Sequence, residues 1–293
     1  MMRQKKDEHW KQLQRCCLVS VRRGDERMLK VKKEHYEKFI AMAKANTCNT
    51  VYPMSVAEGI QQGDIYTDCM KHPTFALFWH VSGFAYLTGK PDEEDLNEIY
   101  NLMTNKSGTN PRRFVLELKD EEVAGYFQKK EDVKEHPRYR FRLEELLGND
   151  DAQCRQEAEK LCEATLPEGY ELREVDEKLL PRISGRIVPS SFWSNGEEFL
   201  KNGKGYCIVY DGEVAAVAFS AAVSSMQVDI GIETAEAHRR KGLAAIVAKK
   251  MVDYVKSIQK EPVWDCDAVN TGSRCTAEKV GFRVMAEHAY YKV

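Results

Sequence analysis

The longest regular pattern of apolar and polar residues lies in the last third of the chain. Residues 226–233 alternate between the two classes with a period of two, which predicts a strand with one buried face. Residues 243–260 place apolar side chains at spacings of three and four, as a helix with one buried stripe does. A short strand is expected at 263–268, followed by a second helix that ends at Lys279. The order strand, helix, strand, helix predicts an α/β fold.

The first 165 residues carry shorter patterns of the same kinds. Ser55-Val-Ala-Glu58 is a capping box and predicts a short helix that begins there. Turn residues and a charged helix fill the segment 148–168, so we expect a boundary between an N-terminal α/β lobe, 1–165, and a C-terminal domain, 166–293. Further helices are expected at 5–14, 35–44, 92–103, 120–128 and 152–163, and further strands at 75–80, 84–88, 113–118 and 139–143, the first two as a hairpin.

Length and charge narrow the classes of protein. At 293 residues the chain exceeds the common size of one domain, which agrees with two lobes. Its 44 basic and 46 acidic residues nearly balance, so no nucleic-acid partner is expected. No apolar run approaches the roughly eighteen residues that a membrane helix needs, so no membrane partner is expected either.

The cysteines indicate a reducing compartment. The nine of them show no framework spacing, and Cys16 and Cys17 are too close for an ordinary bridge. Because residues 1–15 also lack the apolar core of a secretion signal, we expect a soluble cytoplasmic protein. Cys266 has no histidine at a metal-like spacing, so no metal site is expected, and a buried strand thiol is the simpler interpretation.

The segment from His238 to Ala244 joins the alternating strand to the long helix. The first N–H groups of a helix have no partner within it and carry partial positive charge, so they attract anions. Gly242 lets the backbone approach a phosphate closely, and Arg239, Arg240 and Lys241 add cations. A basic cluster with one glycine is more often only a solvated helix start, but the strand before it and the helix after it favour the phosphate interpretation.

Several motifs in this region resemble one family. Arg239-x-x-Gly242-x-Ala244 fits the (Arg or Gln)-x-x-Gly-x-(Gly or Ala) signature of the GNAT superfamily of acetyl-CoA-dependent N-acetyltransferases, and Asn270 with Ala277-Glu-Lys-Val-Gly-Phe282 fits the closing helix of that superfamily. Residues 170–293 resemble its zwittermicin-resistance-like branch in particular, through Phe192-Trp193, Gly203 to Cys207, Ile230 to Thr234 and Pro262 to Asn270.

The resemblance implies a fold and a cofactor. The fold is a mixed, mostly antiparallel sheet flanked by helices, in which the strands at 226–232 and 263–268 splay apart to admit the pantetheine arm of acetyl-CoA. We expect the N-terminal lobe to be a degenerate copy of this fold. It lacks the Arg-x-x-Gly-x-Ala pattern, so it should hold no second CoA. The residues that the resemblance implies for CoA binding are Ile232, Thr234, Arg239, Arg240, Lys241, Gly242, Leu243, Ala244 and Asn270.

Acetyl transfer to an amine needs a base, because an ammonium has no lone pair at neutral pH. Glu233 and Asp229 share the polar face of the strand; Glu233 is our first choice as the base, with Asp229 as an anchor for the ammonium. Both could instead be edge carboxylates that face water. Many family members protonate the leaving thiolate with a tyrosine where this chain has Ala277, so the acid is unassigned; Ser273, Tyr290, Tyr291 and water are the candidates.

These inferences predict an enzyme that transfers acetyl from acetyl-CoA to a primary amine of a small molecule, such as an antibiotic or metabolite. The alternatives are a CoA-binding protein that has lost its chemistry, which the loss of the tyrosine at Ala277 favours, and a structural or adaptor protein that binds neither. For the N-terminal lobe we expect a role in walling the acceptor pocket and in packaging the catalytic lobe, with homodimerisation as one route.

Overall fold

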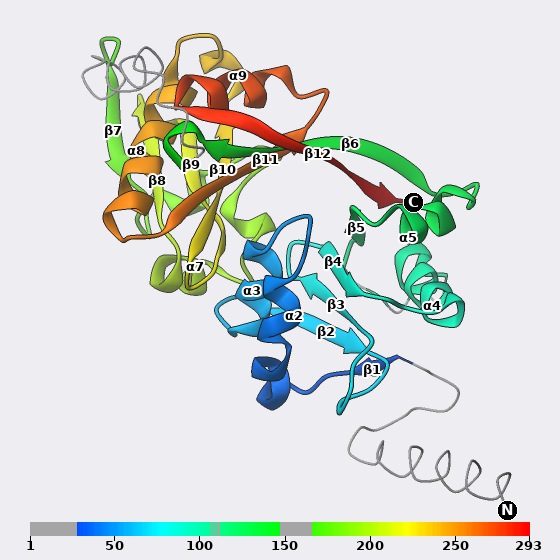
Figure 1. The fold of residues 1–293 in the computed structure, drawn as a ribbon. Helices are drawn as coiled ribbons and strands as arrows, with labels where there is room; N and C mark the ends of the chain where they lie inside the picture. Colours follow the sequence, from blue (N-terminus) through cyan, green and yellow to red (C-terminus); the bar gives the residue numbers. More distant parts are fainter. Residues whose placement is uncertain (1–27, 107, 109, 111, 147–165) are drawn as a thin grey trace, which may run out of the picture.

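The computed structural model describes residues 28–106, 108, 110, 112–146 and 166–293; the helices expected at 5–14 and 152–163 lie outside them. Within these residues, twelve strands form one continuous sheet in the order β1-β2-β3-β4-β5-β12-β6-β11-β10-β9-β8-β7 (Figure 1). The strands are β1 (Leu29–Lys30), β2 (Gly63–Thr67), β3 (Phe75–His80), β4 (Phe84–Gly89), β5 (Val115–Leu118), β6 (Lys134–Leu143), β7 (Tyr170–Glu174), β8 (Gly205–Tyr210), β9 (Glu213–Val223), β10 (Gln227–Thr234), β11 (Glu261–Asp267) and β12 (Phe282–Lys292).

Helices lie between the strands in the chain and pack against the sheet. The α-helices are α2 (Ile40–Lys44), α3 (Val51–Ala57), α4 (Glu93–Thr104), α5 (Glu121–Gln128), α7 (Gly196–Asn202), α8 (Leu243–Ser257) and α9 (Thr271–Lys279). The short 3₁₀ helices are η1 (Lys33–Phe39), η2 (Glu144–Leu146), η3 (Leu180–Arg182), η4 (Pro189–Ser191) and η5 (Glu236–His238). The mixed, mostly antiparallel sheet flanked by helices confirms the expected fold class.

The two halves of the sheet repeat one strand pattern. In each half, two antiparallel pairings are followed by a parallel one: β2-β3-β4-β5 in the first half and β8-β9-β10-β11 in the second. Each half is then completed by a strand of the other, because β12 pairs with β5 and β6 pairs with β11. The long antiparallel pair of β6 and β12 joins the halves at the centre (Figure 1). The division of the chain into 1–165 and 166–293 stays a prediction.

The strongest periodic pattern forms the helix that it predicts. α8 packs against β8, β9 and β10 and buries seven side chains along one stripe: Leu243, Ala245, Val247, Ala248, Met251, Val252 and Val255. Burial of a large apolar side chain contributes roughly 1.5–3 kcal/mol, so this stripe is what holds the helix on the sheet. The helix ends three residues before the expected position because Gln259, at φ 58°, turns the chain toward β11.

Other elements show where tertiary packing overrides local signals. The hairpin expected at 75–80 and 84–88 is confirmed as β3 and β4. The helix start expected at Ser55 is wrong: α3 begins at Val51, and the Ser55 hydroxyl donates to the Tyr52 carbonyl from inside the helix. All seven residues of α3 are buried, so contacts with the sheet set its position rather than a capping side chain. The helix expected at 35–44 is η1 followed by α2.

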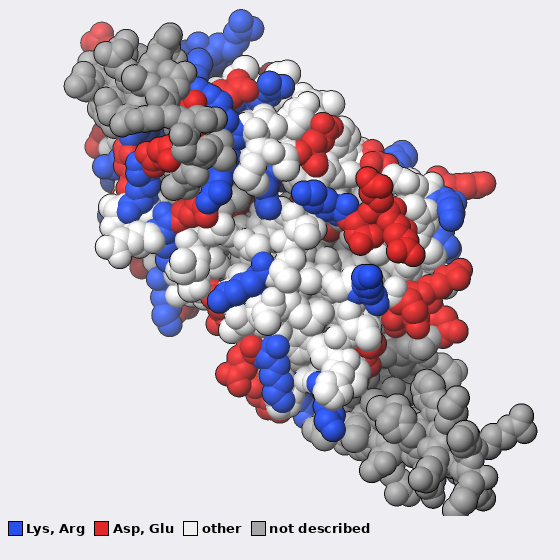
Figure 2. Space-filling model, viewed as in Figure 1, with Lys and Arg blue, Asp and Glu red and all other residues white. Residues whose placement is uncertain are grey.

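The surface carries both signs of charge. On the face in Figure 2, blue basic and red acidic side chains lie interspersed among neutral ones, with carboxylates gathered over the region of α4 and α5. The first turn of α4 supplies the exposed Glu93 and Glu94, and that of α5 supplies Glu121 and Glu122. Acidic residues in these first turns stabilise both helices through the helix dipole.

Candidate functional site

Strands β10 and β11 separate at the centre of the second half. They pair in parallel only over 227–229 and 261–263. Beyond this, β11 pairs with β6 over 264–267, while β10 stays paired with β9 as far as Thr234. The expected splay between the two strands is therefore present, and one edge of β10 is left without a strand partner.

The hydrogen bonds between β10 and β9 show which residues of β10 direct their backbone groups toward the gap. The Ala235 N–H donates to the Ala215 carbonyl at 2.9 Å, so Ala235 directs its backbone groups toward β9. Because antiparallel pairing alternates along a strand, Gly231 and Glu233 do the same, and Ile232 and Thr234 direct theirs into the gap. The structure thus places the backbone of Ile232 and Thr234 where an extended ligand could pair with it, although the Thr234 carbonyl also accepts from Arg239 Nε at 3.2 Å.

The loop that follows β10 has the geometry of an anion site. Arg240 and Gly242 both adopt left-handed backbone conformations, with φ of 64° and 80°. No side chain caps α8, and among the described residues no hydrogen bond to a protein acceptor is present for the N–H groups of 240–244. Consecutive amides in such a turn form a concave nest for anions, and the positive φ of a non-glycine residue is a strained state typical of functional loops.

The cations of the loop have different surroundings. The Lys241 ammonium donates to the Tyr170 hydroxyl at 2.8 Å, and that hydroxyl also lies 2.7 Å from His238 Nδ1. Arg239 lies beside the end of β10, 3.8 Å from Glu233. Arg240 is exposed and has no ion pair among the described residues. Arg239 and Lys241 are therefore held at the loop by protein contacts, and Arg240 is directed to solvent.

The corresponding helix of the first half has the opposite character. α4 follows β4 as α8 follows β10, but Asp92 caps it by accepting from the Asp95 N–H at 2.9 Å. Three carboxylates follow in its first turn. An anion would meet a filled cap and negative charge at this helix start. The absence of a second CoA site in this half stays a prediction.

Glu233 is bonded on both carboxylate oxygens. Oε2 accepts from the N–H groups of Arg186 and Ile187, each at 3.0 Å, and Oε1 accepts from the Thr234 N–H at 3.3 Å. Gly185 permits this approach, since a Cβ there would lie 2.6 Å from Glu233 Cγ. These bonds fix the 185–187 loop against β10 and occupy both carboxylate oxygens of Glu233.

Asp229 lies in a different environment on the same strand face. Its side chain is buried, Oδ2 accepts from the Tyr52 hydroxyl of α3 at 2.7 Å, and Oδ1 has no hydrogen-bond partner among the described residues. Burial, together with the charge of Asp265, raises the pKa of Asp229 to about 7. The hydrogen-bond geometry therefore favours Asp229 over Glu233 as the group that exchanges a proton, the reverse of the order inferred from sequence.

A belt of charged residues extends from Asp229 across the central strands. Asp265 lies 3.5 Å from Arg140, and Arg138 lies 3.5 Å from both Glu117 and Asp267. Four residues of this region were not predicted as site residues from the sequence: Tyr52, Arg138, Arg140 and Glu117, all of which precede residue 166. The arginines stand at alternate positions of β6, a pattern that becomes informative only once β6 is known to lie beside β11.

The remaining candidates lie on or near α9. The Asn270 side chain accepts from the Ser273 N–H at 3.1 Å and so caps this helix. The Ser273 hydroxyl accepts from the Trp264 ring N–H at 3.1 Å. Ala277 is buried, and Tyr290 and Tyr291 lie within β12, with the Tyr290 hydroxyl 3.4 Å from Asp267. Of these groups, Tyr290 contacts the charged belt directly.

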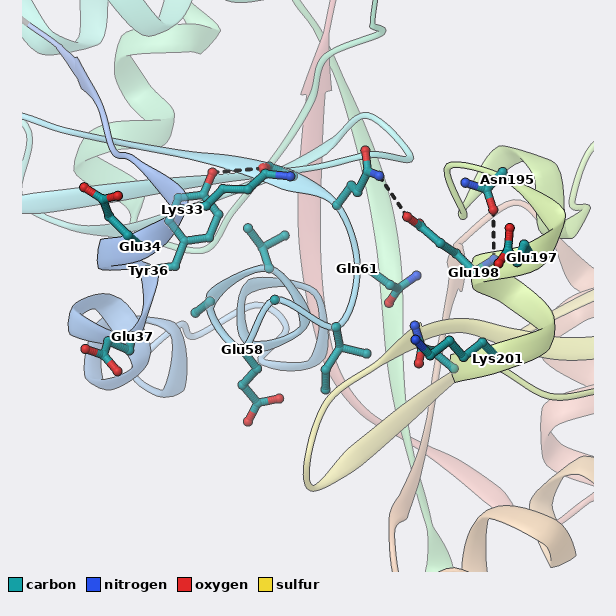
Figure 3. A pocket seen from close by; sticks show the side chains of 17 residues that line it. Lys33, Glu34, Tyr36, Glu37, Glu58, Gln61, Asn195, Glu197, Glu198 and Lys201 are labelled. Carbon is teal, nitrogen blue, oxygen red and sulfur yellow. Dashed lines mark hydrogen bonds between the residues drawn. The ribbon is translucent and has the colours of Figure 1, made fainter. Parts of the chain in front are cut away.

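A cleft of about 600 Å³ lies between η1, the turn after α3, and α7 (Figure 3). Its lining includes five glutamates and two lysines: Glu34, Glu37, Glu58, Glu197, Glu198, Lys33 and Lys201. Gln61 lies between the two walls of the cleft and hydrogen-bonds the backbone of Ala221 and Val223 on β9. The residue between these two, Ala222, pairs with Asp229. The cleft and Asp229 thus lie on either side of β9, and the excess of carboxylates favours cations.

Membrane-spanning helices and metal-binding clusters are both absent from the part of the chain that the structure describes. No helix there is long and apolar enough to cross a membrane. The same residues contain no group of three or more histidine, cysteine, aspartate or glutamate side chains arranged to hold a metal ion.

Comparison with known sequences identifies one family. The family model for GNAT acetyltransferase matches residues 41–291. A curated relative, the uncharacterized N-acetyltransferase YdfB of Bacillus subtilis (strain 168), is 23% identical over 276 residues, covering 88% of this chain and 96% of that protein.

Solved structures show the same fold. A GCN5-related N-acetyltransferase-like protein from Streptococcus suis 89/1591 is similar with a TM-score of 0.69 at 22% identity, covering 88% of this chain and 98% of that one. A tandem GNAT protein from the clavulanic acid biosynthesis pathway, solved without AcCoA, is similar with a TM-score of 0.58 at 10% identity, covering 90% and 97%. The tandem arrangement agrees with the repeated strand pattern described above.

Proposed function

The chain belongs to the GNAT acetyltransferase family, and on that premise we propose that it transfers the acetyl group of acetyl-CoA to a primary amine of a small molecule. The observation that carries the proposal is the set of unbonded N–H groups at 240–244 beside the gap between β10 and β11. The motifs at 192–207 and 262–270 support the zwittermicin-resistance-like branch as the finer placement.

The residues present fit the cofactor. The amides of 240–244 would hold the pyrophosphate, with Lys241 and Arg240 adding charge. The backbone of Ile232 would pair with the pantetheine amides, as would that of Thr234 in exchange for its bonds to Glu233 and Arg239. Leu243 and Ala244 contribute through their backbone alone, and Asn270 would bind the same arm from the start of α9. Bound there, acetyl-CoA supplies an activated acetyl group as a thioester.

For the chemistry we assign Asp229 as the base. An ammonium must lose a proton before it can attack, and a carboxylate with a pKa near 7 accepts that proton more readily than an ordinary one. Oδ1 of Asp229 takes this proton before attack. As the nitrogen then bonds to the acetyl carbon and the carbon–sulfur bond breaks, the nitrogen loses its second proton to water. The Ile232 N–H would polarise the thioester carbonyl.

The leaving sulfur needs a proton, and Ala277 has none to give. A thiol of pKa near 8.5 can leave as a thiolate and take its proton from water. Ser273 and Tyr290 remain the side-chain candidates, and Tyr290 is the one in contact with the charged belt. Glu233 is assigned a structural role in this scheme, since it holds the 185–187 loop and lies beside Arg239.

The acceptor is proposed as a cationic amine. The excess of glutamates around the cleft and the carboxylates of the charged belt support an acceptor that arrives as an ammonium. A panel of ethanolamine, lysine, spermidine and kanamycin tests this proposal by release of the CoA thiol. Binding of acetyl-CoA without thiol release for any amine would instead favour the alternative of a CoA-binding protein that has lost its chemistry.

The cofactor site is tested by Gly242→Glu, which sets a carboxylate where phosphate should bind. The matched control is Gly108→Glu, because Gly108 also has a left-handed backbone, φ 66° against 80°, and a Cβ there would meet no atom within 4 Å, as at Gly242; it follows α4 in the first half. We expect Gly242→Glu to abolish acetyl-CoA binding in calorimetry and Gly108→Glu to preserve it. Equal affinity of the two variants for acetyl-CoA would refute the site assignment.

A further inference from the structure

We propose that Tyr52 is a positioning residue for this reaction: its hydroxyl holds Oδ2 of Asp229 and leaves Oδ1 as the oxygen that takes the proton. The inference rests on the proposed function, because it gives Tyr52 a role through Asp229. It also gives the first half of the chain a part in the reaction that passes through Asp229.

The Tyr52 side chain is held in one orientation. It is buried, its ring stacks on Tyr86 with centroids 5.4 Å apart at 19°, and it meets His80 edge-on at 5.1 Å. Aromatic contacts on two sides leave the hydroxyl no room to swing away from Asp229. The bond to Oδ2, at 2.7 Å, is therefore a fixed feature of the fold and not one of several rotamers.

The start of α3 is anchored to the same pair of strands. Asn49 accepts from the Val51 N–H at 2.8 Å through its side-chain oxygen, and its amide nitrogen donates to Asp265 on β11. The segment 49–52 thus contacts one carboxylate on each of the two separating strands, Asp229 on β10 and Asp265 on β11. This arrangement sets the distance between α3 and β10 on which the Tyr52 bond depends.

Four groups from four different elements act on Asp229. Asp265 of β11 and Glu117 of β5 oppose its negative charge, whereas Tyr52 of α3 and Arg138 of β6 favour it. Of these four, Tyr52 makes the hydrogen bond. A donor to the charged form lowers the pKa of a carboxyl, so loss of the hydroxyl must raise the pKa of Asp229 further.

Tyr52 itself stays protonated. Burial, followed by the charge of Asp229, raises the pKa of its phenol well above the ordinary value of 10. It therefore remains a donor at every pH at which the enzyme would work, and its effect on the reaction passes through Asp229.

The test is Tyr52→Phe, with Tyr86→Phe as the matched control. Tyr86 belongs to the same buried aromatic stack but makes no hydrogen bond to Asp229. The rate with the best amine of the panel is measured against pH. For Tyr52→Phe we expect the acid limb to move up by about one pH unit, since a bond to a charged group is worth about that much. The alkaline plateau should stay within about twofold of wild type, and Tyr86→Phe should leave the limb in place.

Two further measurements separate this role from a structural one. In an Asp229→Asn background, Tyr52→Phe should have no further effect on the rate, because the residue through which it acts is gone. Carbon-13 NMR of labelled aspartate, assigned with Asp229→Asn, should show the Asp229 titration at higher pH in Tyr52→Phe than in wild type.

An equal loss of rate at every pH, or an Asp229 titration that does not move, would overturn the inference. If wild type acetylates no amine of the panel, the proposed function fails, and the NMR titration still decides whether Tyr52 sets the protonation of Asp229.

Discussion

The Tyr52 hydroxyl lies 2.7 Å from Oδ2 of Asp229, across 177 positions of sequence, and so connects α3 of the first half directly to β10 of the second. Asp229 is buried beneath this contact. The environment that raises the pKa of Asp229 is therefore a product of both halves, because Glu117 and Arg138 also belong to the first half and Asp265 to the second.

Replacement of Asp229 by Asn should abolish most of the turnover. The amide keeps the shape of the side chain and an acceptor for Tyr52, but it cannot take a proton, so we expect kcat to fall about 10²- to 10⁴-fold. Calorimetry with acetyl-CoA should give wild-type affinity, since the amides of 240–244 are untouched. A kcat close to wild type in the thiol-release assay would remove Asp229 from the mechanism.

The same variant should be more stable than wild type at alkaline pH. The folded pKa of Asp229, about 7, lies above its ordinary value of 3.8, so burial opposes folding increasingly as pH rises between these values. The gain in Tm of Asp229→Asn over wild type should therefore grow from pH 4 to pH 7 and then level off. A gain that shrinks over this window would show that Asp229 is charged and well compensated in the fold.

Glu233→Gln separates the two carboxylates. Loss of the charge weakens the bonds to Arg186 and Ile187 and the contact with Arg239, so the KM for acetyl-CoA should rise several-fold while kcat changes by less than about threefold. Glu236→Gln, at an exposed neighbouring site, is the control and should change neither constant. A collapse of kcat in Glu233→Gln would return the role of base to Glu233.

Arg240→Gly tests the strained loop. Glycine adopts the observed φ of 64° without a steric penalty, and this gain roughly offsets its greater entropy in the unfolded chain. The free energy of unfolding should therefore stay within about 1 kcal/mol of wild type. If Arg240 adds charge at the phosphates, the affinity for acetyl-CoA measured by calorimetry should fall and should depend less on salt. Unchanged affinity at low salt would exclude a contact between Arg240 and the phosphates.

Glu117→Gln should destabilise the contact of β5 with β6 and β12, where Glu117 meets Arg138 and His288. Burial alone would raise the pKa of Glu117, but Arg138 and His288 lower it to about 2, below the ordinary 4.5. The stabilisation is therefore present above pH 4.5 and is lost as pH falls toward 2. At pH 7 we expect a loss of up to about 3–5 kcal/mol, because the buried Arg138 loses one of its two carboxylate partners and keeps only Asp267 among the described residues.

Urea unfolding of Glu117→Gln and wild type at pH 7 and at pH 3 measures this difference. Glu131→Gln, at an exposed site in the turn before β6, should match wild type at both values. A loss that is as large at pH 3 as at pH 7 would assign the effect to packing and not to charge.

The sequence by itself determined the parts of this protein that depend on near neighbours. The alternation at 226–233 and the spacing at 243–260 are local periodicities, and they predicted β10 and α8 with small errors at the ends. The loop between them is local in the same way, since the glycine and the helix start on which the proposed anion site depends are adjacent in the chain. The separation of β10 from β11 was implied by the family resemblance carried by these motifs, not by periodicity.

Only the tertiary structure decided which distant residues meet. No local pattern indicates that β6 lies between β11 and β12, so Arg138 and Arg140 could not be placed beside Asp265 and Asp267. The same limit applies to the choice between Glu233 and Asp229, which alternate identically along the strand. What distinguishes them is the loop at 185–187 on one and the Tyr52 hydroxyl on the other, because burial and hydrogen bonds from remote segments, and not strand periodicity, set the protonation of a carboxylate.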